Sequence, residues 1–381
     1  MEKPQYPFFS SGPCRKYHNF TLKSLRGAVL NRSHRCIDAK NKVKLALQKT
    51  KAALHLPNDY ILGIIPGGAT GAMEAAIWNM MGEKVVDAFV WDFFSATWSS
   101  DIKNLQIPCR EFTKNYGEIA DLSNYNGNND MIFSLNATTS GVWVINLNWI
   151  PHDREGLTFC DATSGIFCMD IDWLKLDVTI FSWQKGLGSE PGLGTIVLSP
   201  RAVARINNYT PNRAIPKLLE LKKNGVINDA IFKDGQVVNT YSLLTLEDYL
   251  VSLDDYITRG GLVYALQTNK ENYQVIQDFV DHHEWMEFFV KDIMIRSKIS
   301  VTLVIPSLDD EQIDDMVQTL EDENVGYDIK SHMSAPKGLR IWCGSTVDAD
   351  DIRKLMNWIE KLYTRQDSSK PLALFHLDIY P

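Results

Sequence analysis

VTIFSWQKGLGSEPGLGTIVLSP, residues 178–200, is the segment that most clearly indicates the architecture of the chain. Two apolar, β-branched and aromatic runs flank a loop in which Lys185 is followed by four glycines within nine residues. Short continuous apolar runs of this kind are typical of strands buried on both faces of a sheet. The lysine is either an ordinary charged residue beyond a strand end or a residue with a chemical task, and the rest of the chain has to separate these interpretations.

The same pattern precedes this stretch. YILGIIP (60–66), ATGAMEAAIWNMMG (69–82) and VVDAFVWD (85–92) predict strand, helix and strand, and further apolar runs at 131–135 and 157–162 predict two more strands. In the helix, one apolar face is formed by residues 72, 73, 76, 77 and 80. This alternation favours an α/β fold with a mostly parallel sheet covered by helices.

The pattern changes after residue 240. A long helix ended by paired glycines (241–261) and a second helix (271–283) are followed by strand, helix, strand and helix at 297–306, 310–324, 338–344 and 348–363. Since 381 residues exceed the usual size of one core, we expect two domains. We predict a large α/β domain at 14–255, a smaller C-terminal α+β domain at 256–363, an N-terminal segment 1–13 near the active site, and a tail 364–381 of unassigned role.

Composition narrows the class of protein. Hydrophobic residues make up 45% and charged residues 23%, and no run approaches the roughly 18 apolar residues of a membrane helix. The net charge is −8 and the acidic residues are dispersed, which argues against nucleic acid as a partner. The N-terminus lacks the apolar core of a secretion signal, and the six cysteines show no metal-like spacing. We expect a cytoplasmic protein with neither disulfides nor a bound metal, and no membrane partner.

Polar and aromatic residues follow the predicted strands, at the end of an open α/β sheet where ligands bind. They are the turn GGATG (67–71), which opens a helix, Trp98, Thr138, Asp161, and Gln184 with Lys185. Each has a plainer interpretation: a glycine-rich turn for steric reasons, a core tryptophan, an aspartate that caps a turn. The set as a whole is more specific than its members.

An anion site at a helix N-terminus, an aromatic plate, a carboxylate and a lysine are the four parts that pyridoxal phosphate requires. Lys185 is then the point of covalent attachment, and Asp161 pairs with the ring nitrogen. The competing dinucleotide site fails on context, because KGLGSEPGLG contains no G-x-G-x-x-G and precedes a strand instead of a helix. We interpret the glycines as residues that let the chain turn sharply past the cofactor.

These residues resemble the phosphoserine aminotransferase family, within the fold-type I pyridoxal-phosphate enzymes. The resemblance spans roughly residues 8–363 and is closest to the branch found in alphaproteobacteria and some archaea. The matching motifs are FFSSGP (8–13), SHR (33–35), GGATGAMEAA (67–76), NATTSGV (136–142), CDATS (160–164), FSWQKGLG (181–188), NT (239–240) and APKGLRIWCGSTVD (335–348).

The resemblance implies a role for each matching residue. Catalysis would depend on Lys185 and Asp161. Cofactor binding would add Ala69, Thr70 and Gln184 at the phosphate, Trp98 stacked on the ring, Thr138 beside the ring, and Asn239 and Thr240 reaching the phosphate of the neighbouring subunit. Members of this family are homodimers with active sites at the interface.

For the substrate, the resemblance implies Ser11, His34 and Arg35, with Arg340 as a two-pronged clamp on the α-carboxylate. One departure matters. Met333 stands where related sequences carry an arginine, and methionine cannot pair with a phosphate, so either His332 compensates or the enzyme uses a different acceptor.

The implied reaction transfers the amino group of L-glutamate to 3-phosphohydroxypyruvate, giving O-phospho-L-serine and 2-oxoglutarate in serine biosynthesis. Because of Met333, an aminotransferase of the alanine–glyoxylate or serine–glyoxylate type is the alternative. A non-catalytic homologue and an NAD-dependent oxidoreductase are more distant alternatives, and intact Lys185 and Asp161 argue against the former.

Overall fold

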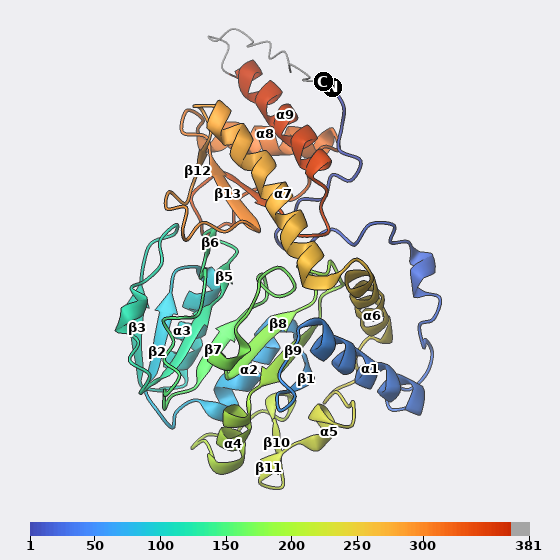
Figure 1. Cartoon of the computed structure of the whole chain (residues 1–381), viewed down its shortest axis with the longest axis vertical. Helices are drawn as coiled ribbons and strands as arrows, with labels where there is room; N and C mark the ends of the chain where they lie inside the picture. The colour runs from blue at the N-terminus through green and yellow to red at the C-terminus, as the bar shows by residue number, and fades with distance from the viewer. Residues whose placement is uncertain (367–381) are drawn as a thin grey trace.

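Residues 1–366 are described by the computed structural model, which contains a large seven-stranded sheet and a separate three-stranded sheet (Figure 1). The strand order of the large sheet is β1-β9-β8-β7-β4-β2-β3. Its strands are β1 (Ile61–Pro66), β2 (Val86–Val90), β3 (Cys109–Thr113), β4 (Asp130–Ser134), β7 (Thr158–Asp161), β8 (Val178–Ser182) and β9 (Leu193–Leu198).

The large sheet is mostly parallel, as predicted. Only β9 runs against its neighbours β1 and β8, and the pairs among β8, β7, β4, β2 and β3 are parallel. Strands β2, β4, β7, β8 and β9 are buried along their whole length. The continuous apolar runs of the sequence therefore mark the centre of the sheet, with helices on both of its faces.

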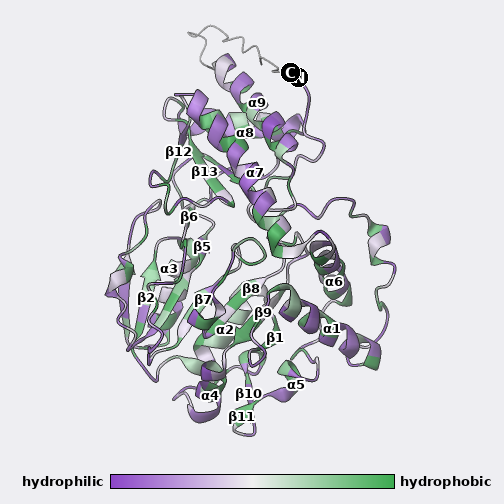
Figure 2. Ribbon diagram, viewed as in Figure 1, coloured by the Kyte–Doolittle hydropathy of each residue, from purple (hydrophilic) through white to green (hydrophobic). Residues whose placement is uncertain are grey.

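Helices cover the two faces with separate apolar clusters. One cluster includes side chains from α2 (Gly68–Met80), α3 (Phe93–Asn104) and α4 (Pro200–Asn208), and the other includes α1 (Ile37–Ala53) and α6 (Leu243–Thr258). The predicted apolar face of α2 is confirmed, because its five members are fully buried. Ala75 and Asn79 are buried as well, so this helix is enclosed on more than one side. The strands are mostly apolar, and hydrophilic residues lie on the outer helices (Figure 2).

The small sheet consists of β12 (Glu287–Phe288), β13 (Ser300–Val304) and β14 (Leu339–Trp342), all antiparallel. It is accompanied by α7 (Gly261–His282), α8 (Asp310–Asp322) and α9 (Ala349–Gln366). Four of these elements, β13, α8, β14 and α9, begin within a few residues of their predicted starts. The prediction for α7 was wrong at its start. Gly260 and Gly261 have φ angles of 110° and 60°, so the glycine pair ends α6 and begins α7 at once.

The shorter elements include the ribbons β5 (Asn136–Ala137) with β6 (Val142–Trp143) and β10 (Lys222–Lys223) with β11 (Val226–Ile227), and helix α5 (Asp229–Phe232). Single turns of 3-10 helix lie at Leu22–Leu25, Leu122–Asn124, Trp173–Lys175 and Lys217–Leu219. Most of the predicted tail, residues 367–381, lies outside the described residues. No helix within residues 1–366 is long and apolar enough to cross a membrane.

The N-terminal segment runs along the small sheet before it reaches the large one. The Phe9 carbonyl accepts a hydrogen bond from the Trp342 amide at 3.0 Å, and the Cys14 amide donates to the Gln184 carbonyl at 2.7 Å. Residues 9–14 thus connect β14 with the loop that contains Lys185. Whether the domain boundaries lie at residues 13 and 255 stays a prediction.

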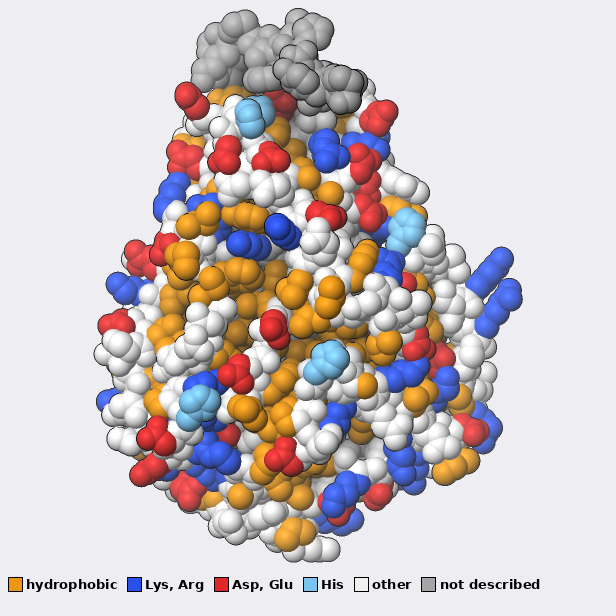
Figure 3. Space-filling model, viewed as in Figure 1, with side chains coloured by type: hydrophobic (Ala, Val, Ile, Leu, Met, Phe, Trp, Pro, Cys, Tyr) orange, Lys and Arg blue, Asp and Glu red, His pale blue; other side chains and the backbone are white. Residues whose placement is uncertain are grey.

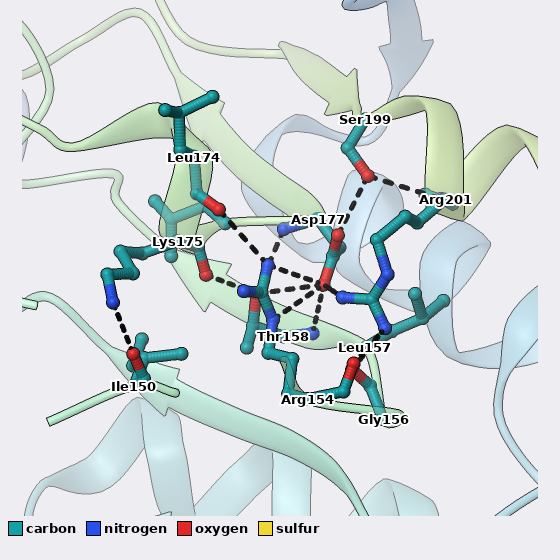
Figure 4. Close-up of polar contacts among 12 residues, drawn as sticks. Ile150, Arg154, Gly156, Leu157, Thr158, Leu174, Lys175, Asp177, Ser199 and Arg201 are labelled. Carbon is teal, nitrogen blue, oxygen red and sulfur yellow. Dashed lines mark hydrogen bonds and ion pairs between the residues drawn. The ribbon is translucent and has the colours of Figure 1, made fainter. Parts of the chain in front are cut away.

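A buried ionic cluster joins strands at the amino end of β8 (Figure 4). Asp177, 1% exposed, accepts hydrogen bonds from Arg154 at 3.1 Å and Arg201 at 3.0 Å, from the Thr158 amide at 3.0 Å and from the Ser199 hydroxyl at 2.9 Å. A buried carboxylate is tolerated when its oxygens are satisfied in this way. The cluster ties β7, β8 and α4 together at the end of the sheet opposite to Lys185.

Candidate active site

A cavity of about 260 Å³ lies at the carboxyl ends of the parallel strands. Because the polypeptide leaves each of these strands at the same edge of the sheet, residues far apart in the sequence meet there. The lining residues are Gly67, Gly68, Ala69, Thr70, Asp92, Phe94, Trp98, Ser134, Asn136, Thr138, Asp161, Thr163, Ser164, Ser182, Gln184, Lys185, Pro191 and Gly192. All seven predicted cofactor-binding residues other than Asn239 and Thr240 are among them.

Lys185 is 7% exposed, so it is not a solvent-exposed loop lysine. Its Nζ donates to the Ser11 carbonyl at 2.7 Å and to Thr138 Oγ1 at 3.0 Å. The pKa of Lys185 is lowered to about 8, chiefly by burial and also by the nearby Arg340 charge, whereas Cys14, Asp161 and Asp92 act in the opposite direction. The amine can therefore lose and regain its proton near neutral pH.

Asp161 faces the same cavity from the end of β7. The indole Nε1 of Trp98 donates to Asp161 Oδ2 at 3.1 Å, and the Thr163 amide donates to Oδ1 at 3.0 Å. Burial raises the pKa of Asp161, while the bonds from Thr163 and Trp98 and the nearby Lys185 lower it. Trp98 thus holds the carboxylate by a hydrogen bond, a contact that the sequence alone did not predict.

The turn before α2 offers a site for an anion. Gly67 and Gly68 have φ angles of 87° and 65°, which glycine adopts without strain, and they lead into the first turn of a 13-residue helix whose amide groups have no partners within the helix. Ser182 Oγ and Gln184 Oε1 also line the cavity, are buried, and have no hydrogen-bond partner in residues 1–366. Unpaired polar atoms on the wall of a cavity are suited to contact with a bound polar group.

The glycines after Lys185 permit close approach of the backbone. A Cβ atom at Gly188 would lie 2.0 Å from the Arg15 carbonyl oxygen, one at Gly186 would lie 2.5 Å from that of Ile166, and one at Gly194 would lie 2.1 Å from that of Gly68. Gly188 and Gly192 also have positive φ angles of 61° and 111°. The loop is pressed between the N-terminal segment and the anion turn, which explains its composition in more detail than a sharp turn alone.

Two predicted substrate residues, Arg340 and His332, lie near Lys185 on the side of the small sheet. Arg340, on β14, is mostly buried, its Nε has no hydrogen-bond partner among the described residues, and burial lowers its pKa. The His332 ring lies 4.9 Å from the Phe93 ring, and its Nδ1 is 2.7 Å from Ser334 Oγ. Burial, with the Arg340 and Lys185 charges, lowers the pKa of His332. Met333 is 93% exposed and turned to solvent.

Four further predicted residues, at positions 34, 35, 239 and 240, are outside the cavity lining of their own chain, as are Ser11, His332 and Arg340. His34 contacts Tyr241, with ring centroids 5.9 Å apart, and Asn239 and Thr240 directly precede that tyrosine. Arg35, Asn239 and Thr240 are exposed. These residues form a second group on the surface, and their roles stay predictions.

Sequence reasoning missed several lining residues. Asp92 caps α3, with Oδ1 2.8 Å from the Ser95 amide, and receives a hydrogen bond from Thr139 at 3.3 Å, so it fixes the helix that contains Trp98. Its position at the carboxyl end of a predicted strand was the signal that could have identified it. Within the described chain, no group of three or more His, Cys, Asp or Glu side chains is placed to hold a metal ion.

The arrangement fits pyridoxal phosphate. The helix N-terminus and the Ser182 hydroxyl match a phosphate, Asp161 matches a protonated ring nitrogen, and the buried amine of Lys185 matches an aldehyde. The unpartnered atoms at Ser182 and Gln184 are the observation that favours a bound group over an empty cavity.

Comparisons with known proteins agree with this chemistry. No family model matches the chain. The chain is 45% identical over 362 residues to a phosphoserine aminotransferase of Methanosarcina mazei, covering 94% of this chain and 97% of the relative. A solved phosphoserine aminotransferase from Cytophaga hutchinsonii has a TM-score of 0.79 at 20% identity, covering 95% and 99% of the two chains. An alanine–glyoxylate aminotransferase from Nostoc also has a TM-score of 0.79, at 17% identity, covering 95% and 96%. The fold is therefore shared by aminotransferases of differing names.

The closeness of Gly194 to the anion turn gives a test. In Gly194→Ala, the new methyl group would overlap the Gly68 carbonyl and displace the turn, so we expect inorganic phosphate to bind the cofactor-free protein roughly tenfold more weakly. The rise in Tm on adding phosphate measures this affinity. Gly27→Ala is the control, because its Cβ would meet only the end of the Glu247 side chain, at 3.3 Å. An unchanged Tm response in Gly194→Ala would contradict the assignment of the turn.

Proposed function

The chain belongs to the phosphoserine aminotransferase family, and we propose that it transfers the amino group of L-glutamate to 3-phosphohydroxypyruvate, giving O-phospho-L-serine and 2-oxoglutarate in L-serine biosynthesis. It is an aminotransferase that depends on pyridoxal phosphate. The observation that carries this function is the buried Lys185 amine, which lies with Asp161 and the first turn of α2 around one cavity.

When bound, pyridoxal phosphate supplies an aldehyde that condenses with amines and a ring that withdraws electrons from the substrate. We assign its phosphate to Ala69, Thr70 and Gln184. Asp161 holds a proton on the ring nitrogen, supported by the hydrogen bond from Trp98, whose ring would cover the cofactor ring. Thr138 would lie beside the ring, where it now accepts from Lys185.

Lys185 has two tasks in this proposal. Its amine is the attachment point, and once freed it moves a proton between carbon atoms of the bound substrate and cofactor. A pKa of about 8 suits both tasks, because the amine is present in its neutral and charged forms near physiological pH. Burial supplies this pKa and also excludes water from the transfer.

We assign the substrate α-carboxylate to Arg340, whose buried Nε has no partner in the described chain and whose guanidinium matches a carboxylate geometrically. Ser11 and His332 border the same region, and Met333 can offer the substrate phosphate no charge. His34 and Arg35 would contribute from the partner subunit, since both lie away from the cavity of their own chain.

The active enzyme would be a homodimer in which Asn239 and Thr240 reach the partner's cofactor phosphate. Apolar side chains are exposed near this second group: Leu22 at 82%, Ile37 at 67% and Leu244 at 45%. The turn of helix at Leu22–Leu25 and α1, which begins at Ile37, both pack on α6. Hydrophobic side chains also gather across the middle of one face, between the two sheets (Figure 3). Exposed apolar patches of this kind are typical of interfaces.

We place the enzyme in the cytoplasm. All six cysteines are free thiols, as suits a reducing compartment.

The choice of substrate is tested by adding O-phospho-L-serine or L-alanine to the cofactor-loaded protein. We expect phosphoserine to bleach the visible absorption band and alanine to leave it unchanged. Bleaching by alanine alone would transfer the function to the alanine–glyoxylate type, which Met333 favours. A protein that takes up no pyridoxal phosphate would overturn the proposal.

The shared active site is tested by mixing two inactive variants, Lys185→Ala and the double variant Asn239→Ala/Thr240→Ala. After co-refolding in equal amounts, we expect about a quarter of the wild-type activity, because half of the dimers are mixed and each mixed dimer has one complete site. Each variant refolded alone is the control. If the mixture stays as inactive as its components, Asn239 and Thr240 do not serve the partner's site.

A further inference from the structure

Ser300 lies behind the two groups that accept hydrogen bonds from Lys185. It belongs to β13 of the small sheet and is completely buried. Its Oγ is 3.0 Å from Ser11 Oγ and 3.3 Å from the Thr138 carbonyl oxygen. A serine hydroxyl has one proton and two lone pairs, so it can serve both contacts at once.

The two residues that Ser300 contacts are those that orient the lysine amine. Ser11 offers its carbonyl oxygen to Lys185 Nζ at 2.7 Å, and Thr138 offers its Oγ1 at 3.0 Å. Ser300 binds the opposite group of each residue, the Ser11 hydroxyl and the Thr138 carbonyl. The four hydrogen bonds thus form a closed ring that runs through the Lys185 nitrogen, Ser11, Ser300 and Thr138.

Neither acceptor has regular secondary structure of its own to fix it. Ser11 is in the N-terminal segment, and Thr138 is in the short connection between β5 and β6. Backbone hydrogen bonds attach the neighbouring residues to the segment that precedes β13, with Ser297 amide to Gly141 carbonyl at 2.8 Å and Trp143 amide to Ile295 carbonyl at 2.8 Å. The Ser300 hydroxyl, in contrast, links β13 directly to Ser11 and Thr138, the two residues that accept hydrogen bonds from Lys185.

We infer that Ser300 is a positioning residue for Lys185, which holds Ser11 and Thr138 in place and so connects the small sheet to the reactive nitrogen. Without this hydroxyl, Ser11 Oγ stays buried and loses the one partner found for it in residues 1–366. An unsatisfied buried hydroxyl favours local displacement or entry of water, and water beside the amine would restore the solvation that Lys185 lacks. The inference rests on the proposed role of Lys185.

The test measures the amine itself in the cofactor-free full-length protein. Acetylation of Lys185 by acetic anhydride, followed by peptide mass spectrometry across a range of pH, reports the neutral fraction of the amine. In the wild type we expect the midpoint near the pKa of about 8. The titratable groups that face the amine are Cys14, Asp92, Asp161, His332 and Arg340, and all variants retain them.

In Ser300→Ala we expect the midpoint to rise, because burial is the largest cause of the lowered pKa and added water relieves it. A rise of about one pH unit would reduce the labelling rate at pH 8 about fivefold. Ser11→Ala removes the same link from its other end and should move the midpoint in the same direction. This second variant decides the matter if Ser300→Ala does not fold.

Ser140→Ala is the matched control, because Ser140 is a buried serine of the same connection whose hydroxyl has no partner among the described residues. Its midpoint should equal that of the wild type. A lowered Tm with an unmoved midpoint in Ser300→Ala and Ser11→Ala would reduce Ser300 to a packing role and overturn the inference. Failure of the proposed reaction would leave these midpoints unaffected, so the two outcomes are distinguishable.

Discussion

The amine of Lys185 is buried, and its burial governs how the segments around the site are placed. A lysine side chain removed from water loses the solvation of its charged form, which brings its pKa down to about 8. The amine tolerates this place because the Ser11 carbonyl and the Thr138 hydroxyl accept its hydrogen bonds. Those acceptors come from the N-terminal segment and from the connection after β5, so three distant parts of the chain have to meet at one atom.

The two ends of the large sheet contribute differently to bringing these parts together. At the amino end of β8, Asp177 gathers Arg154 and Arg201 and fastens strands and helix α4. At the carboxyl end, the chain contacts itself closely through glycines, with Gly188 against Arg15 and Gly194 against Gly68. The ionic cluster at the amino end stabilises the sheet. The carboxyl end borders a cavity whose wall includes buried polar atoms without hydrogen-bond partners in residues 1–366.

Much of the site could be predicted because the carboxyl ends of parallel strands lie at the same edge of the sheet. Lys185, Asp161 and the turn at residues 67–71 each follow an apolar run, so their meeting follows from the topology. The contact of Trp98 with Asp161 and the placement of Ser300 behind Lys185 depend on side-chain packing between distant segments, which no spacing encodes. The start of α7 was missed because a glycine pair usually marks the end of a helix. Here Gly261, with its positive φ, is also the first residue of the next helix. The structure of a single chain gives no contact that assigns a role to His34 or Asn239, because neither residue lines the cavity of that chain.

In the proposed mechanism, the Lys185 amine is the attachment point of pyridoxal phosphate. The most direct measurement is reduction of the cofactor-loaded protein with sodium borohydride, followed by proteolysis and mass mapping of the peptides. We expect the cofactor mass on the single peptide that contains Lys185, and protection of that lysine from acetylation. A cofactor found on another lysine, such as the buried Lys175, or on no peptide at all, would contradict the account.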